Sequence, residues 1–251
     1  MSKILYSLIR FKKDLLSFYL IQRLYERSFF KKINDYRSYL TKETHKKIPK
    51  EKYVYFPLHL EPECSTVPLG GLNYDQLRVI DSLAYYAKQH NFLVVIKEHP
   101  AQKSIGRCFE FYEEIIKNTN VRFIDTKTDS FNLILKSEFI ATITGSSGFE
   151  ALYWGKPVMC FGETILKAAP SVFNPKNEKD FNFFFKNYHK FFCSNKNLRI
   201  FFKTLEENSI SAFIDHFEFM GIDMFKKFGL TPKSISKNLI DNLKKHLKEN
   251  N

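Results

Sequence analysis

Four residues, Gly145, Ser146, Ser147 and Gly148, separate a β-prone run from a short helix-like segment. Serine hydroxyls and the unpaired amide N–H groups at a helix start donate hydrogen bonds, and glycine lets the backbone approach a ligand closely, so a phosphate group suits such a turn. Glu150, one helical turn later, could accept hydrogen bonds from ribose hydroxyls. The equally weighted alternative is that Ser147 only caps the helix and Glu150 belongs to its first turn.

A histidine offers a second polar group. His99 follows the apolar run 92–97, within the sequence Lys-Glu-His-Pro at 97–100. A histidine there could donate a hydrogen bond to a phosphate oxygen or protonate a departing phosphate. A single histidine is more often an ordinary surface or core residue. We interpret Lys97 as out of phase with His99 and therefore as a solvated charge.

A third cluster of polar residues follows the apolar run at 53–58. The segment 57–66, PLHLEPECST, contains His59, Glu61 and Glu63. We interpret Glu61 as a surface carboxylate. Glu63, between a proline and a Ser/Thr pair, is the better candidate for a site.

Alternating strands and helices would position these groups. Strands are predicted at 53–60, 92–97, 121–124, 139–144 and 157–162, and helices at 74–90, 107–118 and from Asp129 or Ser130 to Lys136. This alternation is typical of an α/β protein with a parallel, doubly wound sheet. Because the carboxyl ends of parallel strands meet at one edge, we expect the histidines and the Ser-Gly loop to converge there.

Composition narrows the class of protein. The 44% hydrophobic content fits a globular domain. The four cysteines form no CxxC pair, which argues against a zinc site or a disulfide framework. The sequence has no run of about 18 apolar residues, so no membrane-spanning helix is predicted. The net charge of +12 is uneven. Residues 1–50 carry 13 Lys+Arg against 4 Asp+Glu, residues 51–175 carry 12 against 14, and residues 176–251 carry 14 against 9. The basic ends and the nearly neutral middle predict segments with different roles.

Three stretches, which cover roughly residues 52–165, contain all of these candidate residues: YVYFPLHLEPECSTVPLGGLNYDQ, VIKEHP and IATITGSSGFEALYWGKPVMCFG. Together they resemble the capsule polysaccharide biosynthesis proteins, a family that includes bacterial transferases using CMP-activated sugars such as Kdo. The His-Pro and Ser-Ser motifs are also similar to those of bacterial GT-B sialyltransferases.

The resemblance implies a Rossmann-like domain equivalent to the C-terminal, donor-binding half of a GT-B glycosyltransferase. His99 would match the histidine of the His-Pro motif, Ser146 and Ser147 the phosphate-binding serines, and Glu150 lies in the matching helix. The expected nucleotide-sugar site also includes Gly145, Gly148, His59 and Glu63. His99 and Glu63 are the candidates for a catalytic group. Such transferases need no bound metal for the phosphate leaving group, so we expect neither a metal nor a cofactor.

The chain departs from the GT-B pattern before this domain. GT-B enzymes carry the acceptor site on a second Rossmann-like domain, and residues 1–50 are too few to form one. We therefore expect a basic amphipathic helical segment at 1–50, a nucleotide-sugar-binding domain at 51–175, and a helical C-terminal segment at 176–251 that packs on that domain. A second chain could carry the missing domain, and this chain alone is not expected to transfer a sugar.

The N-terminal segment leaves two interpretations open. A leucine-rich stripe among Lys and Arg residues suits a helix on an anionic membrane surface. Packing of this helix against the domain, with the Lys and Arg side chains in solvent, is the alternative that we favour. The widely separated cysteines indicate reduced thiols and therefore a cytoplasmic protein, at the inner face of the cytoplasmic membrane if the helix binds the membrane. The resemblance implies a lipid-linked saccharide as acceptor. A catalytically silent accessory protein of polysaccharide assembly or export is the alternative. A basic nucleic-acid-binding protein is the third hypothesis, which the nearly neutral central domain disfavours.

Overall fold

The computed structural model describes residues 42, 44–102, 107, 109–209, 229 and 231–249. The chain divides into two compact units, Met1–Ser194 and Asn195–Asn251. Nearly all of the basic helical segment expected at 1–50 lies outside the described residues. The expected boundaries at 50/51 and 175/176 stay a prediction.

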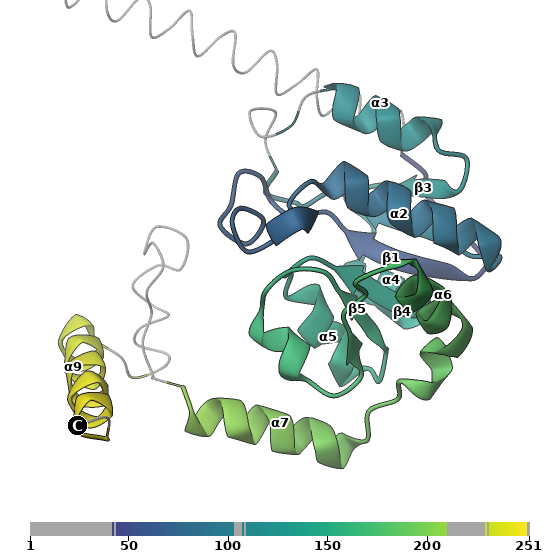
Figure 1. The fold of residues 1–251 in the computed structure, drawn as a ribbon. Coiled ribbons are helices and arrows are strands. Elements are labelled where there is room, and N and C mark those ends of the chain that lie inside the picture. Colours follow the sequence, from purple (N-terminus) through teal and green to yellow (C-terminus); the bar gives the residue numbers. More distant parts are fainter. Residues whose placement is uncertain are drawn as a thin grey trace, which may run out of the picture. The chain divides into compact units, whose positions relative to one another are not determined.

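A parallel sheet of six strands forms the first unit, in the spatial order β3-β2-β1-β4-β5-β6 (Figure 1). The strands are β1 (Tyr53–Pro57), β2 (Leu93–Lys97), β3 (Val121–Ile124), β4 (Phe139–Thr142), β5 (Val158–Cys160) and β6 (Val172–Phe173). The predicted α/β class with a parallel sheet is confirmed. The sequence did not predict β6, because a strand of two residues shows no periodicity.

Helices cover both faces of this sheet. They are α2 (Gln76–Gln89), α3 (Phe109–Lys117), α4 (Ser130–Lys136), α5 (Ser147–Tyr153) and α6 (Glu178–Asn187), with short 3-10 turns η1 (Gly71–Asn73), η2 (Ile165–Ala168) and η3 (Tyr188–Lys190). In Figure 1, α2 and α3 lie on one side of the sheet and α5 on the other. Strand β1 is apolar throughout because both of its faces are covered. On one face, Val54 and Phe56 join the core under α2 and α3. On the other, the Tyr53 hydroxyl donates to the Leu133 carbonyl of α4 at 2.8 Å.

Aromatic residues fasten α6 to the same face as α2. The Phe181 ring stacks on Tyr86 with centroids 4.6 Å apart, and the Phe185 ring stacks on His90 at 5.4 Å. Phe184 and Phe185 are buried. These phenylalanines therefore pack α6 against the sheet and α2.

The order of the strands reverses between β1 and β4. From β1 the chain winds outward through β2 to β3, and it then returns to β4 on the other side of β1. In open α/β sheets, ligands bind in the crevice outside the carboxyl ends at such a point. The segments after β1 and β4 are those that contain His59 and the Gly-Ser-Ser-Gly turn.

The second unit contains two described helices, α7 (Asn195–Glu207) and α9 (Pro232–Glu249). Thr231 and Ser234 cap α9 reciprocally: the Ser234 amide donates to the Thr231 hydroxyl at 3.0 Å, and the Thr231 amide donates to the Ser234 hydroxyl at 2.8 Å. Within the described ranges, no helix is both long and apolar enough to cross a bilayer. The three described cysteines, Cys64, Cys160 and Cys193, are free thiols, whereas Cys108 is outside the described residues.

Candidate functional site

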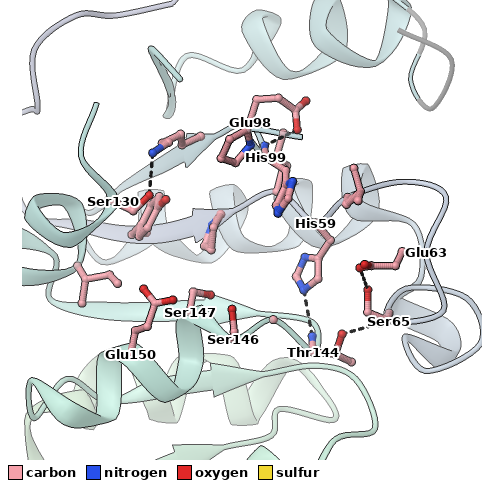
Figure 2. Close-up of a pocket in the computed structure, with 18 residues that line it drawn as sticks. His59, Glu63, Ser65, Glu98, His99, Ser130, Thr144, Ser146, Ser147 and Glu150 are labelled. Atoms are coloured by element: carbon pink, nitrogen blue, oxygen red, sulfur yellow. Dashed lines mark hydrogen bonds between the residues drawn. The ribbon is translucent and has the colours of Figure 1, made fainter. Parts of the chain in front are cut away.

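A cavity of about 380 Å³ opens at the carboxyl ends of β1, β2 and β4 (Figure 2). Its walls come from the three segments that the sequence predicted would converge. Seven of the eight predicted site residues line it: His59, Glu63, His99, Gly145, Ser146, Ser147 and Glu150. Gly148 is not among the lining residues. It is buried, and a Cβ there would lie 2.3 Å from Leu166 Cδ2, so its lack of a side chain serves the packing of α5.

His59 connects the segment after β1 to the segment after β4. Its Nε2 atom accepts a hydrogen bond from the Thr144 amide at 3.1 Å, as Figure 2 shows, and lies 3.3 Å from the Thr142 hydroxyl. Because an amide N–H can only donate, Nε2 must carry a lone pair, and the neutral ring carries its proton on Nδ1. That Nδ1 atom is buried and has no hydrogen-bond partner among the described residues. The Nδ1–H group is therefore a donor without an acceptor.

Burial keeps the His59 ring neutral. The pKa of His59 is lowered from 6.5 to about 4, mainly by desolvation and to a smaller extent by electrostatic interactions with Arg107 and His99. The backbone of His59 is fixed as well, since its amide donates to Gln76 Oε1 at 2.8 Å. The ring is thus held as one tautomer in one place.

The Gly-Ser-Ser-Gly turn presents one exposed and one buried hydroxyl to the cavity. Ser146 is exposed, whereas the Oγ atom of Ser147 is buried and, like His59 Nδ1, has no partner within the described part of the chain. Gly145 leaves no room for a side chain, because a Cβ there would lie 2.9 Å from Thr142 Oγ1 and 3.1 Å from His59 Nε2. Neither serine side chain caps α5: Ser146 occupies the N-cap position without a side-chain capping bond. The alternative in which Ser147 is only a cap is wrong.

His99 and Lys97 both face the cavity. The Nδ1 atom of His99 accepts from the Ala101 amide at 3.2 Å, so the neutral ring carries its proton on Nε2. Lys97 is buried, and its amine donates to the Thr128 carbonyl at 2.6 Å and to the Ser130 hydroxyl at 2.7 Å. Burial lowers the pKa of Lys97, against the opposing effect of Asp129 and Asp125. The interpretation of Lys97 as a solvated charge is wrong, because residues two apart at a strand end share a face and this face is covered.

Glu98 belongs to the support of the cavity. Both carboxylate oxygens accept from Arg107 Nη1, at 2.6 and 2.7 Å, and the Tyr112 hydroxyl donates to one of them at 2.5 Å. The His99 amide donates to the same carboxylate at 2.6 Å. Burial alone would lower the pKa of Arg107, but the charges of Glu98 and Glu61 outweigh it and raise the pKa. A buried, charged pair therefore anchors the His-Pro turn.

Arg107 also holds the segment after β1. It donates to the His59 carbonyl through Nη2, and its Nε lies 3.3 Å from the Glu61 carboxylate. Gln76 donates to the other Glu61 oxygen at 2.5 Å. The interpretation of Glu61 as an ordinary surface carboxylate is wrong. Its partners are 15 and 46 positions away in the sequence, and so no local pattern could reveal them.

Glu63 and Glu150 supply the carboxylates at the rim. Glu63 is exposed and accepts a hydrogen bond from the Ser65 hydroxyl, and the Ser65 carbonyl in turn accepts from the Thr144 hydroxyl at 2.5 Å (Figure 2). Glu150 is exposed on the first turn of α5. Beside it lies Tyr55, whose pKa is raised by burial and, to a smaller extent, by Glu150 and Asp129. These carboxylates can accept hydrogen bonds from hydroxyl groups of a ligand.

The sequence did not single out several lining residues, namely Tyr55, Ser65, Lys97, Ser130 and Thr144. For Lys97, the two-residue spacing to His99 was a usable signal. Ser130 was considered only as a helix cap, a role that Asp129 fills by accepting from the amides of Phe131 and Asn132. Among the described residues, no three His, Cys, Asp or Glu side chains gather as a metal site, and a function without metal stays a prediction.

The cavity therefore combines hydrogen-bond donors of the kind that bind phosphate with carboxylates that bind hydroxyl groups.

Several solved structures are similar to this chain. One is Thermosulfurimonas dismutans KpsC, beta Kdo 2,7 transferase, with 17% sequence identity and a TM-score of 0.41, where the match covers 72% of this chain and 62% of that one. Another is Thermosulfurimonas dismutans KpsC, beta Kdo 2,4 transferase, with 20% identity and a TM-score of 0.39, where the match covers 55% of this chain and 44% of that one. A third is UDP-GlcNAc 2-epimerase from Neisseria meningitidis bound to UDP-GlcNAc, with 20% identity and a TM-score of 0.40, where the match covers 62% of this chain and 45% of that one. This chain spans less than two thirds of each of these proteins, and likenesses of this size carry no functional argument.

No curated protein matches the chain at a significant level. The family model for capsule polysaccharide biosynthesis proteins matches residues 12–169, which is more than half of the chain. The matched range includes the three stretches that carry the sequence resemblance and every segment that lines the cavity. The chain belongs to the capsule polysaccharide biosynthesis protein family.

Proposed function

We propose that this chain is the donor-binding part of a glycosyltransferase in capsular or surface polysaccharide biosynthesis, and that its donor is a CMP-activated sugar such as Kdo. The observation that carries the proposal is the cavity at three strand ends, where His59 Nδ1–H and Ser147 Oγ are buried without partners. A buried donor without an acceptor costs free energy, so a ligand rich in acceptor oxygens is expected there.

The hydrogen-bond donors of the cavity could stabilise a phosphate leaving group. During sugar transfer the bond between the anomeric carbon and a phosphate oxygen breaks, and negative charge develops on the nucleotide. The serine hydroxyls and the Lys97 amine would stabilise that charge, because fixed donors in a partly buried site need no reorganisation. The proton on Nε2 of His99 could pass to the departing phosphate. Glu150 would bind the ribose hydroxyls.

The acceptor side of the reaction needs a base. An acceptor hydroxyl that attacks the anomeric carbon must lose its proton, and Glu63, exposed at the rim, is the candidate within this chain. We place the acceptor, a lipid-linked saccharide, on a second chain that carries the other Rossmann-like domain. The complex would work in the cytoplasm at the inner face of the membrane.

Isothermal titration calorimetry with CMP tests the proposal. Replacing both serines in Ser146→Ala/Ser147→Ala should weaken CMP binding by roughly tenfold or more, since a hydrogen bond to a charged group contributes about 1.5–3 kcal/mol. Ser82→Ala is the matched control, because the Ser82 hydroxyl donates to its own helix, at 2.9 Å from the Arg78 carbonyl. Equal CMP affinity in wild type and double variant would remove the phosphate role, and a preference for UDP would contradict the choice of cytidine.

A further inference from the structure

Exposed aromatic and apolar side chains lie on α4, on α5 and the turn after it, and on the segment after η3, and α4 and α5 also line the cavity. The Phe131 and Trp154 rings meet edge to face with centroids 4.7 Å apart, and the Phe192 ring packs over Gly155, where a Cβ would lie 3.3 Å from it. The exposed fractions are large for apolar side chains: Tyr153 63%, Trp154 52%, Phe192 72%, Phe131 39% and Leu135 36%. We call these five residues the aromatic patch. An apolar surface of this kind indicates an interaction site.

The segments that carry the aromatic patch contain lysines and no acidic residues. These segments are 130–137, 151–162 and 188–194, and their lysines are Lys136, Lys156 and Lys190. Lys136 and Lys190 are exposed, and Lys156 is half-buried with its amine 2.7 Å from the Ser137 carbonyl.

The carboxylates that border these segments are engaged elsewhere. Asp129 accepts from the first amides of α4, and Glu138 accepts from the Tyr188 hydroxyl at 2.9 Å. Glu150 lines the cavity, and Glu163 lies 2.5 Å from the Lys167 amine. The aromatic patch is therefore bordered by ammonium groups whose charge a surface of opposite sign would balance.

We infer that the aromatic patch is the surface through which this protein binds an anionic lipid bilayer. Indole and phenol rings favour the headgroup region, where one end of the ring is apolar and the other is hydrated. Lysines beside them are attracted to anionic headgroups. This surface is distinct from the N-terminal basic segment, and the inference does not depend on the reaction proposed above.

The aromatic patch and the cavity lie on the same two helices, so the patch can position the cavity at a membrane. Helix α4 contributes Ser130 to the cavity and Phe131 to the aromatic patch, and α5 contributes Glu150 to the cavity and Tyr153 to the patch. Two short helices thus carry both surfaces. Binding through the patch holds the cavity next to the headgroups, where substrates with lipid tails are found.

The chain's single tryptophan, Trp154, lies in the patch and reports on it directly. We expect its emission to shift to shorter wavelength when the full chain is mixed with vesicles of phosphatidylglycerol and phosphatidylcholine, and lipids with brominated acyl chains should quench it. Vesicles of phosphatidylcholine alone should give a much smaller shift. Salt should weaken binding to the anionic vesicles by screening the lysines.

Matched variants distinguish binding through the aromatic patch from nonspecific binding of exposed residues to vesicles. Tyr153→Ser should lower the vesicle partition coefficient by about fivefold or more, whereas Tyr85→Ser, at an equally exposed tyrosine (62%) on α2, should not change it. Lys190→Glu should lower it by at least about fivefold, and Lys88→Glu, on α2, should have little effect. All four positions are exposed, and circular dichroism verifies that the variants fold.

Three results would overturn the inference. The first is co-sedimentation with vesicles without a change in Trp154 emission, which would assign binding to another part of the chain. The second is equal loss of binding in Tyr153→Ser and Tyr85→Ser. The third is Trp154 emission that is already shifted without vesicles, or that shifts with protein concentration, which would show that protein covers the patch.

Discussion

The Nε2 atom of His59 accepts a hydrogen bond from the Thr144 amide at 3.1 Å, and this bond joins the segments after β1 and β4 at the point where the strand order reverses. The bond requires an unprotonated Nε2 atom. The same contact therefore fixes the loop geometry and makes Nδ1–H the donor that remains for a ligand.

The first prediction concerns pH. The pKa of His59 is lowered in the folded chain, from 6.5 to about 4. As the pH falls below 6.5, the unfolded chain binds a proton that the folded chain excludes until about pH 4. The free energy of unfolding should therefore be fully retained above pH 6.5 and should decrease between pH 6.5 and 4, by up to about 3 kcal/mol from this group.

Urea unfolding at several pH values measures this effect. In His59→Gln the amide oxygen can still accept from Thr144, but the side chain does not titrate, so its stability should decline less across the same window. His189→Gln, at an exposed histidine, is the control and should follow the wild type. Parallel curves for wild type and His59→Gln would show that His59 is not the titrating group.

The second prediction concerns the buried ion pair. Glu98→Gln leaves the Arg107 charge without its main partner, and breaking a buried pair in this way typically costs about 3–5 kcal/mol. The variant should be strongly destabilised in denaturant unfolding. Since Arg107 also holds His59 and Glu61, CMP affinity should fall as well.

An exposed pair of the same length is the matched control for Glu98. Glu114 and Lys117 lie 2.6 Å apart, and their side chains are 59% and 66% exposed. Glu114→Gln should leave the unfolding midpoint unchanged within error, because solvent screens exposed pairs. Equal effects of the two substitutions would argue against a supporting role of the Glu98–Arg107 pair.

The third prediction concerns Lys97. Lys97→Met keeps an apolar chain of similar length but removes the amine from the cavity, so CMP affinity should drop by about tenfold or more and its dependence on salt should weaken. Lys156→Met is the control: Lys156 is also partly buried, and its amine donates to a carbonyl, but it does not line the cavity. If both variants bind CMP like the wild type, Lys97 does not contact the phosphate.

The fourth prediction concerns activity. The purified chain should bind CMP-Kdo without transferring the sugar to a lipid-linked saccharide, because holding both reactants can contribute about 7–11 kcal/mol to lowering the barrier and the acceptor domain is expected on another chain. Adding that chain should restore transfer. Robust turnover by the purified chain alone would contradict the prediction, and Glu63→Gln and His99→Ala would then identify the catalytic group.

Local sequence patterns determined the elements and the edge at which the site forms. Apolar runs at 92–97 and 139–144 predicted strands of a parallel sheet, and the structure has strands at Leu93–Lys97 and Phe139–Thr142. Glycine and serine after one strand, and His-Pro after another, then had to meet at the carboxyl edge. The sequence therefore predicted seven of the residues that line the cavity.

Only the tertiary structure decided what each polar side chain does. Glu98 and Glu63 are both carboxylates in polar segments, yet Glu98 is buried against Arg107 and Tyr112, whereas Glu63 is exposed at the rim. His59 is neutral because burial excludes the charged ring. Burial and long-range partners set these states, and both depend on segments that lie far apart in the sequence and meet only when the sheet forms.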